Sequence, residues 1–83
     1  MPNKKRTIHG QQRHRDDDRP TAQAFRDKEN PVEIYLQRDG RMVYIGKSGR
    51  THVFEAEAHL TSFITTKRVR ERKVWNGLWQ KLF

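Results

Sequence analysis

The pair Asp39 and Gly40 stands between two runs of alternating apolar residues, and it constrains the fold more than any other feature of the chain. Asp-Gly is typical of the two-residue loop of a type I′ β-hairpin, because both loop positions need a positive φ. With that loop, Tyr35 pairs with Tyr44, and the opposite face of the hairpin is apolar. The side chains that this register gathers on the apolar face are Ile34, Leu36, Val43 and Ile45. We therefore predict a hairpin over residues 32–46 with this face in the core.

The residues after the hairpin predict a third strand and a covering helix. A turn at Ser48 and Gly49 leads into residues 51–54, which fit a short strand. Apolar residues then recur at the i, i+4, i+7, i+8 spacing of an amphipathic helix, at Ala56, Leu60, Phe63 and Ile64. For residues 31–83 we expect a small α+β domain, a three-stranded antiparallel sheet packed by one or two helices.

The C-terminal residues allow two interpretations. Residues 67–75 are rich in helix formers, and Asn76 and Gly77 are typical of a helix C-terminus, which is the interpretation that we favour. The alternative is a second hairpin across Asn76 and Gly77, in which Trp75 pairs with Leu78.

Residues 1–30 have the composition of a flexible basic arm. They hold eight Lys and Arg against five Asp and Glu, with only three large apolar side chains to offset the entropy of ordering. Within them, Thr21 is suited to cap a short helix over residues 22–28, with Pro31 ending it.

The whole chain is basic, with 83 residues, a formal net charge of +8 and no cysteine. The lack of cysteine excludes a disulfide, a thiolate nucleophile and a Cys-ligated zinc site. No stretch approaches the roughly 18 apolar residues of a membrane span. We expect a cytoplasmic protein that needs no cofactor or metal and has no membrane partner. The charge favours nucleic acid as the partner first, and an acidic protein second.

Positive charge is concentrated in residues 67–83, where six Lys and Arg face the single acid Glu71. Trp75 and Trp79 lie in the same stretch and offer flat rings that suit either a core or a base. We predict a nucleic-acid-binding module that contacts mainly phosphates, with RNA and DNA both open. Its predicted contacts are cations of this segment and of the turn after the hairpin, with two tyrosines as stacking platforms: Lys47, Arg50, Lys67, Arg68, Arg70, Arg72, Lys73, Tyr35 and Tyr44.

Two histidines suggest an alternative function, a small metal-independent ribonuclease. Cleaving RNA without a metal requires a base for the 2′-OH proton, an acid for the leaving oxygen and a cation on the phosphorane. Imidazole titrates near neutral pH, so it suits both proton transfers. The candidate catalytic residues are His52, His59, Thr61 and Ser62. A third possibility is a basic assembly subunit that binds an acidic protein.

Two stretches resemble known nuclease families. Residues 33–35 and 43–47 are similar to the opening hairpin of GIY-YIG nucleases, but Glu33 replaces the first glycine of that pattern, so an intact active site of that family is not expected. Residues 49–79, with GRTHVF, HLTSF, a basic run and Gly-Leu-Trp, resemble small ribonuclease domains of bacterial polymorphic toxins. Those domains combine a sheet with helices and use His, Ser or Thr and basic residues. This resemblance implies a site at His52, His59, Thr61 and Ser62.

Overall fold

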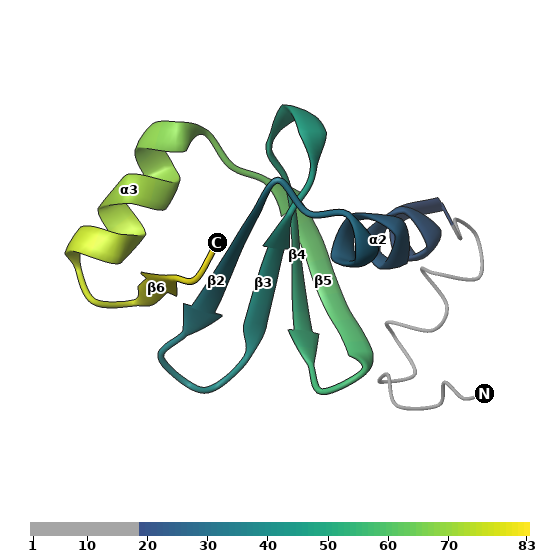
Figure 1. Ribbon diagram of the computed structural model, residues 1–83, viewed down its shortest axis with the longest axis horizontal. Helices are drawn as coiled ribbons and strands as arrows, with labels where there is room; N and C mark the ends of the chain where they lie inside the picture. Colours follow the sequence, from purple (N-terminus) through teal and green to yellow (C-terminus); the bar gives the residue numbers. More distant parts are fainter. Residues whose placement is uncertain (1–18) are drawn as a thin grey trace.

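Among residues 19–83, five antiparallel strands form one sheet in the order β5-β4-β3-β2-β6, with two helices packed against it, so the domain is α+β (Figure 1). A computed structural model describes residues 19–83, with side chains from Thr21 onward. The strands are β2 (Glu33–Gln37), β3 (Met42–Ile45), β4 (Arg50–Glu55), β5 (Ala58–Ile64) and β6 (Trp79–Lys81). The helices are α2 (Arg19–Glu29) and α3 (Lys67–Trp75), and a short 3₁₀ turn, η1 (Lys47–Gly49), connects β3 to β4. The part of the predicted arm before Arg19 lies outside the described residues.

The predicted hairpin is present, but its loop has three residues instead of two. The amide of Gln37 donates to the carbonyl of Arg41 at 2.7 Å, and the amide of Gly40 donates to the carbonyl of Gln37 at 2.8 Å. Gly40 has a φ of 95°, the left-handed conformation that closes a three-residue loop of this kind. Asp39 contributes a side-chain cap, because its Oδ1 accepts from the amide of Arg41 at 3.1 Å.

The longer loop shifts the pairing of β2 and β3 by one residue. Tyr35 pairs with Val43, and Ile34 pairs with Tyr44, so the predicted pairing of Tyr35 with Tyr44 is wrong. A shift of one residue turns a strand over relative to its neighbour. Tyr35 therefore enters the core beside Val43, while Ile34 and Leu36 lie on the other face with Tyr44.

The predicted amphipathic helix over Ala56 to Ile64 is wrong, because residues 58–64 of this stretch form the strand β5. Strand β4 occupies the place of the predicted third strand, and β5 pairs with it through a tight turn. The run from Thr61 to Ile64 contains β-branched and aromatic residues, which favour a strand when a partner edge is present. Pairing with β4 therefore determines the structure of this stretch, in spite of the helical spacing of its apolar residues.

Helix α3 confirms the favoured interpretation of residues 67–75. The hydroxyl oxygen of Thr66 caps the helix by accepting from the amide of Val69 at 3.2 Å. At the other end, Gly77 has a φ of 77°, and its amide donates to Val74 while the amide of Leu78 donates to Lys73. This is the Schellman arrangement, and it turns the chain back so that β6 pairs with β2 as a fifth strand.

The two helices contact opposite faces of the sheet. Helix α3 meets the face that carries Glu33 and Trp79, through an ion pair from Arg70 to Glu33 and contacts with β6. Helix α2 meets the other face, where the ring of Phe25 packs edge-on against Phe54 at 5.2 Å. Figure 1 shows α2 beside β4 and β5 and α3 at the opposite edge of the sheet, next to β6.

Residues 19–29 are part of the folded unit, whereas the sequence placed them in the flexible arm. They contain the short helix predicted over residues 22–28, with Thr21 inside it, not at its cap. Helix α2 contacts β3, β4 and β5, and its residue Ala24 is fully buried. The main core lies on the face toward α3 and consists of Tyr35, Val43, Ile45, Val53 and Trp79, with Leu60 packed against it.

Candidate functional site

A chain of hydrogen bonds joins the two histidines through one serine. His52 on β4 pairs across the strands with Ser62 on β5, and the Nδ1 of His52 lies 2.7 Å from the Ser62 Oγ. The Nε2 of His59 lies 2.7 Å from the same oxygen. Residues 59 and 62 are three apart, so in a regular strand their side chains would point to opposite faces. An irregularity in the β4–β5 pairing at Leu60 turns His59 back to the face of Ser62.

The chain continues to Asp27, on α2, which was absent from the predicted site. Its Oδ2 lies 2.6 Å from the Nε2 of His52. When His52 is neutral, its Nε2 carries the proton and donates to the carboxylate of Asp27. Its Nδ1 is then unprotonated and can only accept a hydrogen bond. The hydroxyl of Ser62 then donates to His52 and accepts from His59. The predicted acid–base residues His52 and His59 are therefore joined in one hydrogen-bonded chain that ends at the carboxylate of Asp27 on α2.

Asp27 is held as a carboxylate by four donors. Arg50 binds it in a bidentate manner, because Nε donates to Oδ2 at 2.9 Å and Nη2 donates to Oδ1 at 3.0 Å. The side-chain amide of Gln23 donates to Oδ1 at 2.9 Å. Burial raises the pKa of Asp27, but the hydrogen bonds from Arg50, His52 and Gln23 outweigh burial and lower the pKa to about 2. The hydrogen bond to Asp27 in turn raises the pKa of Arg50.

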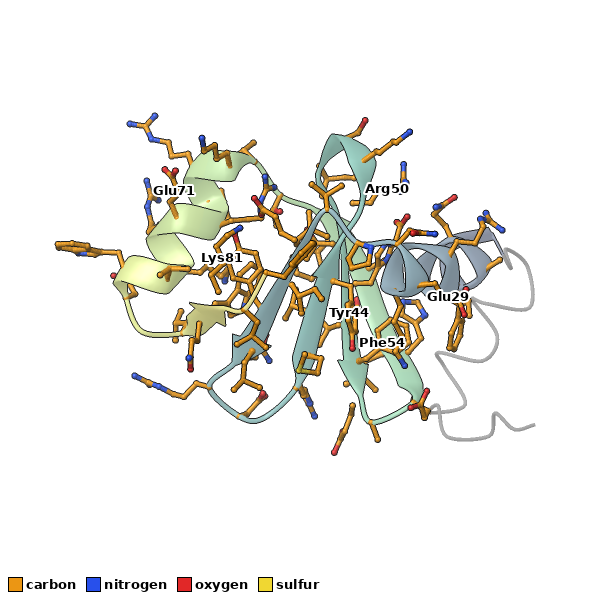
Figure 2. The ribbon with its side chains drawn as sticks, in the orientation of Figure 1. Glu29, Tyr44, Arg50, Phe54, Glu71 and Lys81 are labelled. Carbon is orange, nitrogen blue, oxygen red and sulfur yellow. The ribbon has the colours of Figure 1, made fainter. Side chains whose placement is uncertain are left out.

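The histidines are closed off from solvent in this conformation. His52 is 2% exposed and His59 is 4% exposed, while Ser62 is half-buried and Thr61 is exposed. Figure 2 labels Arg50, Tyr44 and Phe54 on the part of the sheet next to α2. The structure therefore brings His52, Ser62 and His59 together, leaves Thr61 outside the hydrogen-bonded chain, and covers the pair with α2.

Several of the predicted nucleic-acid contacts are engaged within the protein. Arg50 is paired with Asp27, and Arg70 donates to Glu33 and to the carbonyl of Thr65, both at 2.9 Å. The ammonium of Lys73 lies 5.5 Å from the centre of the Trp79 ring.

The two predicted stacking tyrosines also pack within the protein. Tyr35 is buried and donates to Glu33, and Tyr44 packs against Phe54 with ring centres 5.5 Å apart. Burial, followed by the hydrogen bond to Glu33, raises the pKa of Tyr35 to about 12.

The remaining predicted cations are exposed, and one of the two predicted aromatic rings is exposed with them. Lys47, Lys67, Arg68 and Arg72 are exposed and make no ion pair with another described residue. Trp75, at the end of α3, is 88% exposed, whereas Trp79 is buried and donates from Nε1 to Gln37 at 3.1 Å. The sequence showed two tryptophans in the basic segment, but their exposure depends on where the helix ends and β6 begins.

Arg68, Arg72 and Trp75 share one side of α3. Their spacing of i, i+4 and i+7 places them in a single stripe along the helix. No residue of α3 is buried, so the stripe is not needed to hold the helix to the core. Arg70 and Lys73 instead turn toward the sheet, where Arg70 donates to Glu33 on β2 and Lys73 lies over the ring of Trp79 on β6.

Comparisons of this chain with family models, curated proteins and solved structures find no match. The resemblances to two nuclease families therefore stay predictions. Among residues 19–83 no helix is both long and apolar enough to cross a membrane. Within the same range no three His, Asp or Glu side chains converge as ligands for a metal ion.

Proposed function

We propose that the protein binds single-stranded nucleic acid along α3. The observation that carries this proposal is the stripe of Arg68, Arg72 and Trp75, because it combines an 88% exposed indole with two guanidinium groups that form no ion pair with another residue of the described range 19–83. Proteins that bind single strands combine cations along the backbone with aromatic rings on which bases stack. Lys67 adds a third exposed cation at the start of the helix. RNA and DNA both fit this chemistry.

Each partner in the stripe has a distinct physical signature. A guanidinium that neutralises one phosphate lowers the slope of log affinity against log salt by about 0.7 for a single strand. Stacking on Trp75 depends little on salt and contributes roughly 1–3 kcal/mol per base. The proposal therefore separates into two measurable parts.

The test is a salt titration of binding to a labelled single-stranded oligonucleotide. We expect Arg68→Gln combined with Arg72→Gln to flatten the slope by about 1.4, since two phosphate contacts are removed. The matched control is Arg26→Gln combined with Arg41→Gln, which removes the same charge from α2 and the hairpin. Equal flattening in both proteins would mean that net charge, not α3, governs binding. Absence of binding by the wild type would favour the acidic protein partner.

A second candidate function, a metal-independent ribonuclease, is supported by one observation. The predicted acid–base pair, His52 and His59, is bridged by Ser62 at 2.7 Å on each side. Because α2 covers the pair, cleavage would require α2 to move. We expect activity of this kind to persist in EDTA, to follow a bell-shaped pH profile and to fall by roughly 10² in His59→Ala. Intact RNA after prolonged incubation would leave binding as the function.

A further inference from the structure

The carboxylate of Asp27 is bound by three nitrogen atoms of strand β4. Arg50 presents two parallel N–H groups to it, at 2.9 and 3.0 Å, and His52 presents a third donor at 2.6 Å. The fork of arginine matches the two oxygens of a carboxylate and the oxygens of a phosphate equally well. The donors come from β4, whereas the anion comes from α2, which is a separate element laid over the sheet.

The backbone of Gly46 lies directly beside the carboxylate of Asp27. A Cβ placed on Gly46 would lie 2.2 Å from Oδ2 of Asp27 and 2.7 Å from Oδ1. Gly46 has a φ of −100°, which any residue adopts, so its lack of a side chain serves space and not conformation. Gly46 opens the loop Gly-Lys-Ser-Gly that leads into Arg50, and the exposed Lys47 lies next to it.

We propose that α2 masks a phosphate-binding site formed by Arg50, His52 and the backbone of Gly46, and that Asp27 is its built-in occupant. When Asp27 is withdrawn, the same donors face a phosphate group, and Ser62 and His59 stand behind His52. No covalent step is involved. The site is distinct from the basic stripe of α3 and does not depend on nucleic-acid binding there.

The mask gives the buried carboxylate on α2 a role. An anion tethered to the same chain is present at a local concentration of millimolar or higher, so it outcompetes a free phosphate of similar affinity. Displacing α2, or removing the carboxylate, ends that competition. The ligand class is therefore a phosphate group, either free or within a nucleic-acid backbone.

The test uses the full chain and inorganic phosphate as the probe. Phosphate is titrated at constant ionic strength, and binding is followed by calorimetry and by the NMR signals of the His52 ring. Asp27→Ala is expected to bind phosphate at least about tenfold more tightly than the wild type, which corresponds to one or two charge-assisted hydrogen bonds. Adding Arg50→Gln should abolish the gain, whereas adding Arg41→Gln, which removes an arginine beside the hairpin loop and outside the site, should preserve it. Absence of a gain, or a gain that survives Arg50→Gln, overturns the proposal.

Folding of the variant is part of the same test. If Asp27→Ala unfolds in chloride, phosphate should restore its circular dichroism spectrum by replacing the missing anion, since a ligand that binds only the native state stabilises it. Asp27→Asn, which keeps the shape of the side chain, should show a larger rise of its thermal midpoint in phosphate than the wild type. Failure of both responses overturns the proposal. Comparing a dinucleoside monophosphate with inorganic phosphate on Asp27→Ala then shows which source of the phosphate the site prefers.

Discussion

Gly46, which follows β3, lies so close to Asp27 on α2 that a side chain at position 46 would overlap the carboxylate, with a Cβ 2.2 Å from Oδ2. The two residues are 19 positions apart in the sequence, and α2 reaches β3 across the face opposite the main core. The position of α2 therefore depends on a residue that has no side chain.

The first prediction follows from that overlap. Gly46→Ala should destabilise the protein by about 1–3 kcal/mol, because the methyl group forces Asp27 or α2 to move. In Asp27→Ala the same methyl group has space, so the cost of Gly46→Ala should be much smaller there. Urea unfolding of the two single variants, the double variant and the wild type measures this coupling. Additive effects would contradict the close packing of residues 27 and 46.

The second prediction concerns acid stability. Asp27 has a folded-state pKa of about 2, below its ordinary value, so its ionised form stabilises the fold above the ordinary value. That contribution, about 2 kcal/mol, is lost as pH falls toward the folded-state value. Urea unfolding of the wild type between pH 5 and pH 2 should show this loss, and Asp27→Asn should lack that part of it. Asp39→Asn, which removes an exposed carboxylate, is the matched control and should retain it.

The third prediction distinguishes the two tryptophans. Trp75→Ala should change the free energy of unfolding by no more than about 0.5 kcal/mol, because the ring is exposed. It should nevertheless weaken binding to a single strand by about 1–3 kcal/mol. Trp79→Ala should destabilise the fold by about 3–5 kcal/mol, because that ring is buried against Tyr35. Unchanged binding by Trp75→Ala would remove stacking from the proposed function.

The fourth prediction tests the register of the hairpin through Tyr35. The structure buries its hydroxyl against Glu33, with a raised pKa of about 12, whereas the register predicted from sequence turns Tyr35 away from the core. Ultraviolet titration should detect a tyrosine that ionises near pH 12, and Tyr35→Phe should remove that step. Loss of the hydrogen bond should cost about 1 kcal/mol of stability. A titration identical in Tyr35→Phe and the wild type would contradict the observed register.

Elements with a strong local signal were predictable from the sequence. The hairpin around Gly40, the strand β4 and the helix α3, which Gly77 terminates, each depend on nearby residues, because turns and caps are made by neighbours in the chain. The concentration of charge in residues 67–83 is likewise a property of composition alone. These features defined an α+β domain with a basic C-terminal helix.

The site required tertiary information at three points. The hairpin loop has one residue more than predicted. The resulting shift of register places Tyr35 in the core in place of Ile34 and Leu36. Residues 58–64 form a strand although the apolar residues of this stretch have helical spacing. The edge of β4 offers backbone hydrogen bonds, and the spacing of apolar residues gives no information about such a partner. The irregularity at Leu60 then turned His59 toward Ser62.

The amino-acid sequence sets which side chains are available to the site, namely His52, His59, Ser62 and Arg50, and it sets the composition of the basic segment with its two tryptophans. Which of these side chains meet, which are exposed and what covers them depend on how the elements pack. The tertiary structure joined Asp27 to His52 across 25 positions, closed the pair beneath α2 and left Trp75 exposed beside Arg72. Hydrogen bonding and burial depend on distances in space, and the packing of the helices on the sheet sets those distances.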